Sequence, residues 1–538
     1  MTPPPQTLRR ILLRARLNAP RRGALHHRLT TLVAALLPGE RPGATVDALL
    51  RQAARAIGAG EPGPIWLTLA VLTARLPEAE DVVRLRRYRD LHGADALLAS
   101  IVAVIPRDAQ GVRVEVVTGE VVVDVNHLAR TTLTTGIQRV TQRTVSRWRR
   151  DHRLSLVCWT DDELAMRRTS PTETARVIGN AHPEKARDGR PLHTVVVPWR
   201  SHYVLPEVAL EVTRTSRIQA LALYGRCSTT AIGFDAVPLT SAETTDTNVP
   251  GYFMRELGAI RHMDRVACIS EAAEREYRGW RTMLSSLGVP GPDVREVTLP
   301  VEASTPTPAE LSAARDRYTL PGTPLVLCVG SHEPRKNHLA VLHAAELLWR
   351  KGHAFTLLFV GGNAWHSERF HQRLDELRGA GRSVEAALGV PDSALWALYR
   401  LARCTVFPSL NEGFGLPVAE SLASGTPAVT SNFGSMKEIG KGGGTLLVNP
   451  RDDHAIARAI ETLLADDVVH ARLVREAAAR PTRTWDDYAR ETWDYMVATP
   501  APSAPDRGGM DGPALSVRGP SSAPSPSTRG CRPAPPGW

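Results

Sequence analysis

The sequence predicts an α/β protein with two doubly wound domains, each built on a mostly parallel sheet. Three observations support this fold class. The chain has 538 residues, which is too long for one compact core. Short apolar runs alternate with helical stretches, and this alternation occurs in two separate series. A Pro/Thr-rich break at 304–308 divides the series. We therefore expect domains at 116–303 and 310–498, a helical extension at 1–115 and a disordered tail at 499–538.

The extension is predicted to be helical because Leu, Ala and Arg recur at helix-like spacing between Pro/Gly breaks. Its first acidic residue is Glu40, whereas basic residues are frequent before it. The arginines concerned are Arg9, Arg10, Arg14, Arg16, Arg21, Arg22 and Arg28, and they are interleaved with Leu12, Leu13, Leu17 and Leu25. Residues 1–30 could thus form a basic amphipathic helix on an anionic membrane, or only a solvated or frayed helix. Both interpretations remain open.

The first series of predicted strands begins with Val121–Val125, an apolar run typical of a buried parallel strand. Further strands are expected at 154–159, 194–198, 231–234 and 265–269, with helical segments between several of them. The second series predicts strands at 325–330, 355–360, 404–407 and 427–430, and helices at 338–350, 393–402 and 417–423. Ligands of such sheets bind beyond the carboxyl ends of the strands. We therefore expect the site in a cleft across which the two domains face each other.

Composition and charge restrict the class of protein. Hydrophobic residues make up 43% and charged residues 23%, as in globular proteins. Six cysteines show no metal-type spacing, and several lie in apolar runs, which favours buried thiols in a reducing compartment. No run reaches the roughly 18 apolar residues that span a bilayer. We expect a cytoplasmic protein, peripheral to the inner face of the membrane if residues 1–30 bind there. The tail is rich in Pro, Ser, Gly and Ala and is expected to be disordered.

The segment Pro408–Glu420 carries the most specific chemistry. It follows a short buried strand and opens a helix, with Pro417 at a favourable first position. Two glycines around Phe414 let the backbone approach a ligand, and the free amides at a helix start can donate to hydroxyl or phosphate oxygens. Glu412 and Glu420 can face one cleft as paired acceptors for sugar or ribose hydroxyls. The alternative is purely structural, with Glu420 interacting with the helix dipole and the glycines serving as turn residues.

A second segment, Gly330–Asn337, begins at a strand end and precedes a helix. Arg335 and Lys336 stand side by side there, and two cations in a partly dry cleft stabilise the charge of a leaving diphosphate. The alternative is a solvated charged turn in which Asn337 caps the helix.

Together, in this order, these segments closely resemble retaining glycosyltransferase family 4, whose members have the two-domain GT-B architecture. The resemblance covers about 325–465. The matching positions are Gly330…Glu333-Pro334-Arg335-Lys336-Asn337, Leu398-Tyr399…Ala402, Phe407-Pro408-Ser409, Glu412-Gly413-Phe414-Gly415-Leu416-Pro417…Glu420, Gly425-Thr426-Pro427 and Ser435-Met436-Lys437-Glu438.

The resemblance implies roles for these residues. Lys336 and Arg335 would bind the donor diphosphate, beside the strand-ending Gly330. Glu412 would hold the donor sugar together with the backbone of the loop, namely Phe414, Gly415 and Leu416. Glu420 would take the ribose hydroxyls. Many relatives have an Arg directly after the strand-ending Gly, whereas this chain has Ser331-His332. Either Arg335 carries the missing charge alone or His332 shares it.

A weaker resemblance extends over 119–300. Gly136, in Thr135–Val140, is similar to the family's Gly-Ile-x-Arg segment, in which a loop backbone approaches the donor phosphate. Phe234 stands where relatives often have His or Tyr, so the following Asp235 is our catalytic candidate near the anomeric carbon or the acceptor. Asp235 could equally cap the following turn. Ser270 matches an Ile-Ser-x-Ala segment and is favoured as a helix N-cap.

The implied activity is transfer of a hexosyl group, with mannose favoured, from a nucleotide diphosphate sugar to a glycan or lipid-linked acceptor in cell-surface polysaccharide assembly. The catalytic set comprises Glu412, Lys336, Arg335 and Asp235. Retention by front-face substitution relies on positioning and leaving-group stabilisation. We expect no cofactor and no divalent metal, because no Asp-x-Asp motif is present.

Three alternatives remain. One is another enzyme on the same fold, such as a nucleotide-sugar epimerase or a phosphorylase-like enzyme. Another is a non-catalytic GT-B protein that binds a nucleotide sugar, for which the departures at Phe234 and Ser331 are the only support. The net charge of +10 would allow nucleic-acid binding, but the basic residues lack a recognised motif or interleaved aromatic residues. We therefore expect no nucleic-acid partner.

Overall fold

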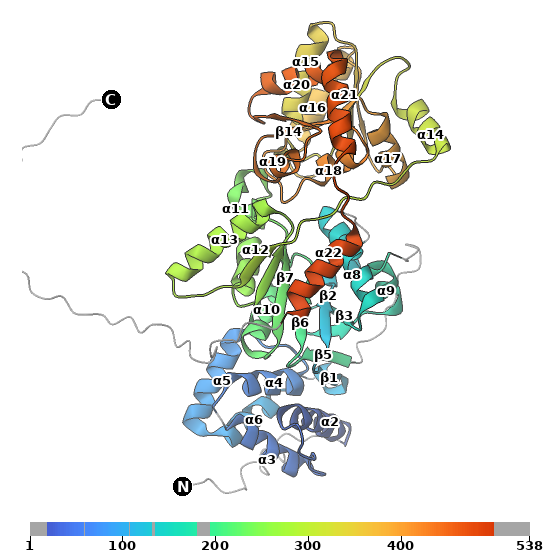
Figure 1. The fold of residues 1–538 in the computed structure, drawn as a ribbon. Coiled ribbons are helices and arrows are strands. Elements are labelled where there is room, and N and C mark those ends of the chain that lie inside the picture. The colour runs from blue at the N-terminus through green and yellow to red at the C-terminus, as the bar shows by residue number, and fades with distance from the viewer. Residues whose placement is uncertain (1–18, 59, 107, 132–134, 180–193, 500–538) are drawn as a thin grey trace, which may run out of the picture. The chain divides into compact units, whose positions relative to one another are not determined.

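The computed structural model describes residues 19–499, apart from 59, 107, 132–134 and 180–193. The described chain comprises a helical region, a first sheet with its helices and a second sheet with its helices (Figure 1). The prediction of two Rossmann-like domains after a helical extension is confirmed. The expected disordered tail lies outside the described residues, except for Thr499.

The helical region contains α2 (Ala19–Leu36), α3 (Val46–Ile57), α4 (Pro62–Thr73), α5 (Ala79–His92) and α6 (Ala94–Ala103). Helix α4 is apolar on all sides and almost wholly buried, as expected for a helix at the centre of a bundle. Its Trp66 ring stacks on Trp199 of the first sheet domain, with 6.3 Å between centroids. The extension therefore shares a core with that domain.

Helix α2 corrects part of the membrane-helix expectation. Leu25 and Leu29 are buried in the core. Arg28, only 2% exposed, donates hydrogen bonds to the carbonyl oxygens of Leu72 (2.7 Å), Val112 (2.9 Å) and Ala109. Burial lowers the pKa of Arg28 to about 10. The two leucines are apolar and pack in the core. The Arg28 guanidinium can be buried beside them because backbone carbonyl oxygens accept its hydrogen bonds. Arg9, Arg10, Arg14 and Arg16 lie outside the described residues.

The first sheet has the strand order β1-β5-β4-β3-β2-β6-β7-β8-β9. The strands are β1 (Arg113–Val117), β2 (Val121–Asp124), β3 (Ser155–Trp159), β4 (Met166–Arg168), β5 (Thr194–Pro198), β6 (His202–Leu205), β7 (Ser228–Gly233), β8 (Arg265–Cys268) and β9 (Asp293–Glu296). Its helices are α7 (Asn126–Arg130), α8 (Gly136–Asp151), α9 (Pro171–Val177), α10 (Val212–Tyr224), α11 (Val237–Thr240), α12 (Val249–Ile260) and α13 (Glu271–Ser286). All neighbouring strands of this sheet in the described chain run parallel except β4, which is antiparallel to β3 and β5.

The second sheet is parallel, with the order β12-β11-β10-β13-β14-β15. Its strands are β10 (Leu325–Val329), β11 (Thr356–Val360), β12 (Val384–Ala387), β13 (Cys404–Phe407), β14 (Ala428–Ser431) and β15 (Thr445–Val448). Its helices are α14 (Pro308–Tyr318), α15 (His338–Arg350), α16 (Glu368–Gly379), α17 (Asp392–Leu401), α18 (Leu416–Ala423), α19 (Gly434–Gly440), α20 (Asp453–Ala465) and α21 (Asp467–Ala478). The order reverses between β10 and β13, which is the switch point where ligands of Rossmann folds bind.

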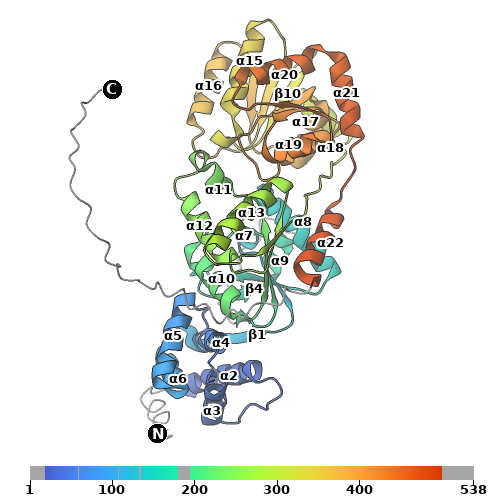
Figure 2. The same ribbon diagram turned by 60° about the vertical axis from the view of Figure 1, so that its left-hand side comes forward.

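Helix α22 (Trp485–Trp493) returns to the first sheet domain, beside α8 (Figure 2). The Trp148 indole on α8 donates a 2.8 Å hydrogen bond to the Ala489 carbonyl oxygen. The Trp493 ring lies edge-on to Trp148, with centroids 5.8 Å apart. The prediction that 310–498 forms the second domain is therefore wrong for α22. The contact joins residues far apart in the chain and leaves no local pattern in the sequence.

The predicted strands 194–198 and 404–407 and the predicted helix 338–350 coincide with β5, β13 and α15. Six strands of the described chain were not predicted: β1, β4, β6, β9, β12 and β15. Four of them, β1, β9, β12 and β15, form the edges of the two sheets, where one side lacks a neighbouring strand. The other two, β4 and β6, lie inside the first sheet and are only three and four residues long. Strand β1 starts at Arg113, so the helical region ends before residue 115.

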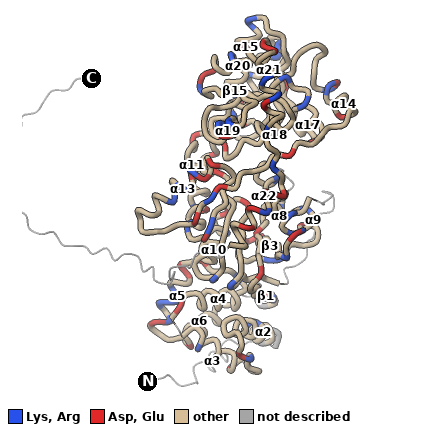
Figure 3. The backbone as a smooth tube through the Cα atoms, viewed as in Figure 1, with Lys and Arg blue, Asp and Glu red and all other residues tan. Residues whose placement is uncertain are grey.

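Three further findings concern the whole described chain. Among the described residues, no helix is both long and apolar enough to cross a bilayer. The five cysteines within this part of the chain, Cys158, Cys227, Cys268, Cys328 and Cys404, are free thiols and buried. Acidic and basic positions are interspersed in each of the three regions (Figure 3).

Candidate active site

The candidate site forms where two loops of the second domain leave neighbouring strands at the switch point. Loop 330–337 follows β10 and loop 408–415 follows β13. Leu410 N donates a 2.9 Å hydrogen bond to the Arg335 carbonyl oxygen, and Ser409 Oγ lies 3.0 Å from the same oxygen, so the two loops are joined. The two loops follow parallel strands that are neighbours in the sheet. Lys336 and Glu412, which are 76 positions apart in the chain, therefore come into direct contact.

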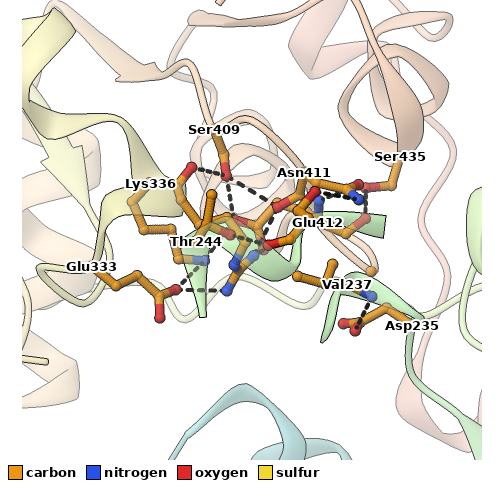
Figure 4. A network of polar contacts seen from close by, with 12 residues as sticks. Asp235, Val237, Thr244, Glu333, Lys336, Ser409, Asn411, Glu412 and Ser435 are labelled. Carbon is orange, nitrogen blue, oxygen red and sulfur yellow. Dashed lines mark hydrogen bonds and ion pairs between the residues drawn. The ribbon is translucent and has the colours of Figure 1, made fainter. Parts of the chain in front are cut away.

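Glu412 is the centre of a buried charge cluster in these loops (Figure 4). Its Oε1 lies 2.6 Å from Lys336 Nζ, and its Oε2 lies 2.7 Å from Arg335 Nη1. Arg335 Nη2 also donates to Glu333 Oε1 at 2.6 Å. The side chains of Glu412, Lys336 and Arg335 are only 9%, 11% and 16% exposed. This segment is therefore not the solvated charged turn of the alternative interpretation.

Electrostatics keep Glu412 ionised. Burial by itself would raise the pKa of this carboxyl, but the charges of Arg335 and Lys336 outweigh burial and lower the pKa to about 2. The pKa of the Arg335 guanidinium shifts in the opposite direction. Burial by itself would lower it, but the charges of Glu412 and Glu333 outweigh burial and raise it. An incoming diphosphate would meet two cations that are already desolvated and oriented, which strengthens their attraction.

A close approach between the domains fixes loop 408–415. A Cβ added at Gly413 would lie 2.5 Å from the Phe234 carbonyl oxygen and 2.7 Å from Asp235 Oδ2. Only a glycine allows this contact, so Gly413 is more than a turn residue. Ser270 Oγ donates to the Gly413 carbonyl oxygen at 2.6 Å and accepts from Ala273 N. Ser270 is thus the expected N-cap of α13 and also a contact between the two domains.

Asp235 follows β7 and is partly buried against this loop. Its Oδ1 accepts a 3.1 Å hydrogen bond from Val237 N, which is the turn-capping role that the sequence left open. Burial raises the pKa of Asp235, partly offset by the Arg335 charge. The structure therefore brings Asp235 close to the Glu412 cluster while it caps its own turn. Phe234, in place of the usual His or Tyr, is buried.

Glu420 lies on α18, and its side chain is 7% exposed. One carboxylate oxygen faces Arg139 Nη1 at 2.5 Å, and the other accepts a 2.9 Å hydrogen bond from Tyr399 OH. Arg139 belongs to α8 of the first sheet domain, so this ion pair joins the two domains. Burial raises the pKa of Glu420, and Arg139 and Tyr399 act against that rise.

The remaining expected donor residues surround these carboxylates. Gly415 has φ = 101°, which suits glycine, and Leu416 begins α18 directly after it. The N–H groups of a helix's first turn have no intrahelical partner and can donate to a ligand. Phe414 is buried, so only its backbone is free to contribute. Gly136 begins α8, and a Cβ there would lie 3.5 Å from Leu416 Cδ1. Gly330 directly follows β10 and lies beside the Lys336 side chain.

Two expectations about loop 330–337 need correction. His332 cannot share the charge of the missing arginine, because it is 1% exposed, burial lowers its pKa, and its Nδ1 lies 3.1 Å from Asn363 Oδ1. Asn337 stands at the N-cap position of α15, but its side chain makes no capping bond. Its Nδ2 instead donates to the carbonyl oxygens of Pro408 (3.1 Å) and Pro450 (2.7 Å), which ties the two loops together.

Several contributing residues were not singled out as site residues from the sequence. They are Arg139, Tyr399, Ser409, Asn411 and Ser435, all of which contact the two carboxylates or their loop. Ser409 Oγ donates to Glu412 Oε1 at 2.7 Å, and Asn411 Nδ2 reaches Thr240 Oγ1 of the first domain at 2.9 Å. Four of these residues lie within the segments that carry the family resemblance, and Asn411 lies inside the Pro408–Glu420 segment. Their position in these motifs is the one feature of the sequence that could have identified them as site residues.

The loop also borders a cavity of about 420 Å³, lined among others by His332, Glu333, His338 and Phe370. Glu333 is common to this cavity and to the charge cluster. In the described part of the chain, no cluster of three or more His, Cys, Asp or Glu side chains has an arrangement able to hold a metal ion.

Comparison with protein families places the candidate site within a known domain. Residues 313–480 match the family described as "Glycosyl transferases group 1". This range includes both loops and Glu420.

Curated relatives match parts of the chain. The serotype-specific mannosyltransferase WbdA of Escherichia coli is 29% identical over 272 residues, covering 48% of this chain and 32% of that protein. The O-antigen chain mannosyltransferase B of Escherichia coli is 36% identical over 163 residues, covering 30% of this chain and 42% of the relative. A D-inositol 3-phosphate glycosyltransferase of Acidothermus cellulolyticus is 32% identical over 264 residues, covering 46% and 56%. The chain thus spans about a third to just over half of the length of these relatives.

Solved structures establish the fold. The structure of Anabaena Alr3699/HepE in complex with UDP and glucose aligns with a TM-score of 0.52 at 13% identity, covering 71% of this chain and all of that one. The Candida albicans trehalose-6-phosphate phosphatase N-terminal domain aligns with a TM-score of 0.51 at 12% identity, covering 71% and 97%. The chain has the GT-B fold of two Rossmann-like domains.

Proposed function

We propose that this protein is a retaining glycosyltransferase of family 4 that transfers a hexosyl group from a nucleotide diphosphate sugar to a glycan or lipid-linked acceptor. The observation that carries the proposal is the buried Glu412–Lys336–Arg335 cluster at the switch point of the second sheet. It combines cations for a diphosphate with an ionised acceptor for sugar hydroxyls. The glycosyltransferase match over 313–480 and the UDP and glucose bound in Alr3699/HepE support the same function.

The residues take distinct roles in this proposal. Lys336 and Arg335 bind the donor diphosphate, and Glu412 accepts hydrogen bonds from the sugar hydroxyls. The backbone at Phe414, Gly415 and Leu416 donates to the donor. Glu420 receives the ribose hydroxyls.

Gly136, at the start of α8, and Gly330, directly after β10, let the backbone come close to the phosphates. Asp235 lies near the anomeric carbon or the acceptor, because it contacts Gly413 directly after Glu412.

The reaction is a front-face substitution. The bond from the anomeric carbon to the phosphate oxygen breaks, and its electron pair stays on the nucleoside diphosphate. The acceptor hydroxyl oxygen forms the new bond from the same face, and its proton moves to the departing phosphate oxygen. Arg335 and Lys336 stabilise the negative charge that grows on this oxygen. No side chain needs to act as a base, so the step depends chiefly on positioning.

The names of the relatives guide the choice of substrate. Two are mannosyltransferases, one of them for O-antigen chains, which favours a mannose-like sugar and cell-surface polysaccharide assembly. We propose a cytoplasmic location, a peripheral membrane contact through the basic residues that precede α2 and no divalent metal requirement. Transfer that persists in EDTA is the expected result for the last point, and loss of transfer restored by Mg²⁺ would contradict it.

The function is tested by calorimetry and thermal shift with GDP-, UDP-, TDP- and ADP-sugars. A true donor raises the melting temperature through its preferential binding to the native state. Wild type is compared with Glu420→Ala and Lys336→Ala, and Lys351→Ala is the matched control, since that lysine is 56% exposed at the end of α15.

We expect one nucleotide series to bind wild type and the control, and both site variants to bind it at least about tenfold more weakly. Donor and acceptor screening with that series then identifies the product. If folded wild type binds none of these nucleotide sugars, the proposed function is wrong. Binding without any transfer or donor hydrolysis would instead favour a non-catalytic protein, and donor isomerisation would favour an epimerase.

A further inference from the structure

The ion pair between Arg139 and Glu420 connects the two sheet domains at the proposed ribose site. Arg139 lies in the first turn of α8, and Glu420 lies on α18, 281 positions further along the chain. Arg139 Nη1 is 2.5 Å from Glu420 Oε1, with the two side chains 28% and 7% exposed. The contact is therefore a partly buried, charge-assisted hydrogen bond, which is stronger than a neutral one.

This contact conflicts with the role proposed for Glu420 unless it breaks. Each carboxylate oxygen keeps a second acceptor site beside its present donor. The Glu420 side chain is only 7% exposed while Arg139 is in place, however, so ribose hydroxyls cannot reach it unless a neighbouring side chain moves. Tyr399 OH already donates to Oε2 at 2.9 Å and is fully buried, so that partner cannot easily leave. Arg139 occupies Oε1 and comes from the opposite domain. Arg139 is therefore the group that the ribose hydroxyls must displace.

The released guanidinium remains beside the expected diphosphate. Helix α8 begins at Gly136, one turn before Arg139, and a Cβ at Gly136 would lie 3.5 Å from Leu416, the first residue of α18. Two helix N-termini thus meet here, and such ends attract anions. Lys336 and Arg335 approach the same loop through Glu412. A long arginine side chain anchored at this place can reach either a carboxylate or a phosphate.

We propose that Arg139 changes partner when the donor binds: it pairs with Glu420 in the ligand-free protein, and it moves to the donor diphosphate when the ribose hydroxyls take Glu420. This inference rests on the proposed function, because it assumes a ribonucleoside diphosphate donor. Arg139 is then a specificity-determining residue, since a ligand must supply both the hydroxyls and the phosphates to replace the ion pair without loss.

The test compares Arg139→Gln and Arg139→Lys with wild type, using GDP, UDP and ADP and the corresponding nucleosides guanosine, uridine and adenosine as calorimetric and NMR probes. Measurements are made at about pH 8, well above the ordinary carboxyl range, because burial raises the pKa of Glu420. Arg143→Ala is the matched control, because Arg143 is an exposed arginine one turn further along α8. Melting temperatures and circular dichroism establish that each variant is folded.

We expect Arg139→Gln to bind the diphosphate about tenfold more weakly and the nucleoside about threefold more tightly, because phosphate contact is lost while the competitor for Glu420 is removed. Arg139→Lys should recover part of the diphosphate affinity, and Arg143→Ala should match wild type. Opposite responses of nucleoside and diphosphate are the distinguishing result, since loss of local structure would weaken both.

Three results overturn the inference. Equal weakening of both ligands, or no change in either, assigns Arg139 a structural role only. Tighter binding of both ligands makes Arg139 a competitor that never reaches the phosphates. A weaker diphosphate with an unchanged nucleoside makes it a phosphate ligand without exchange at Glu420. Failure of the proposed function is a separate outcome, in which wild type binds none of the diphosphates.

Discussion

At the residue scale, Glu412 is the side chain on which the most contacts of the candidate site converge. It faces Arg335 and Lys336 through separate oxygens, and Ser409 donates to it as well. Because all these groups are largely buried, removing Glu412 takes one carboxylate partner from each cation and leaves both to share Glu333. The same interactions therefore determine both the local stability and the charge presented to a ligand.

Glu412→Gln should lower the free energy of unfolding by about 3 kcal/mol at neutral pH, since Lys336 and Arg335 lose one of their two carboxylate partners and keep only Glu333. The folded-state pKa is about 2, below the ordinary value of 4.5. The stabilisation by ionised Glu412 is thus complete above about pH 4.5 and is lost as the pH falls towards 2. Urea unfolding of variant and wild type across this range measures the difference, which should shrink with acidification. A difference independent of pH would contradict the assignment.

Tyr399→Phe tests the other carboxylate. The variant keeps the buried ring but removes the hydroxyl that donates to Glu420 Oε2. We expect donor binding to weaken about threefold to tenfold and stability to fall by about 1–2 kcal/mol, because one buried acceptor loses its donor. Calorimetry and chemical unfolding measure these effects. Unchanged donor affinity would show that Tyr399 does not help to orient Glu420.

At the element scale, the site depends on two loops that end neighbouring parallel strands. Loops 330–337 and 408–415 bring their charges together only because β10 and β13 are adjacent at the switch point. Asn337 and Ser409 then fasten one loop to the other through side-chain hydrogen bonds. The first domain completes this arrangement by packing Phe234 and Asp235 against Gly413.

Gly413→Ala should disrupt this packing, since the new methyl group would lie 2.5 Å from the Phe234 carbonyl oxygen and the neighbouring backbone must move. We expect transfer activity to fall about a hundredfold, as displacement of a positioned group by about 1 Å can have this effect. Gly362→Ala is the control, because a Cβ there meets no atom within 4 Å and should leave activity within about twofold. Equal activity of the two variants would contradict a positioning role for the contact at Gly413.

At the scale of the whole molecule, the described chain joins its two sheet domains in two ways. The Arg139–Glu420 and Asn411–Thr240 contacts connect them at the site. Helix α22 connects them elsewhere, because it follows the second domain in sequence and packs on α8 of the first. The described fold of the first domain is therefore completed only by residues near the end of the described chain.

Trp493→Ala should lower the free energy of unfolding by about 3 kcal/mol, since Trp493 is 9% exposed and stacks on His152 at 3.8 Å and edge-on against Trp148. Val468→Ala is the control, as Val468 on α21 is 80% exposed and should change stability by less than about 0.5 kcal/mol. Chemical unfolding followed by tryptophan fluorescence measures both. A Trp493 variant as stable as the control would show that α22 does not contribute to the first domain.

The sequence by itself determined the fold class, most of the central strands and the two motifs of the site. These features are local: a buried strand requires a continuous apolar run, and a ligand-binding loop requires glycines and charges at fixed spacing. The tertiary structure alone decided which charges meet, such as Arg139 with Glu420, and that His332 turns into the core. It also decided that α22 joins the first domain. These outcomes depend on burial and on contacts between residues far apart in the chain, and no local pattern encodes either of them.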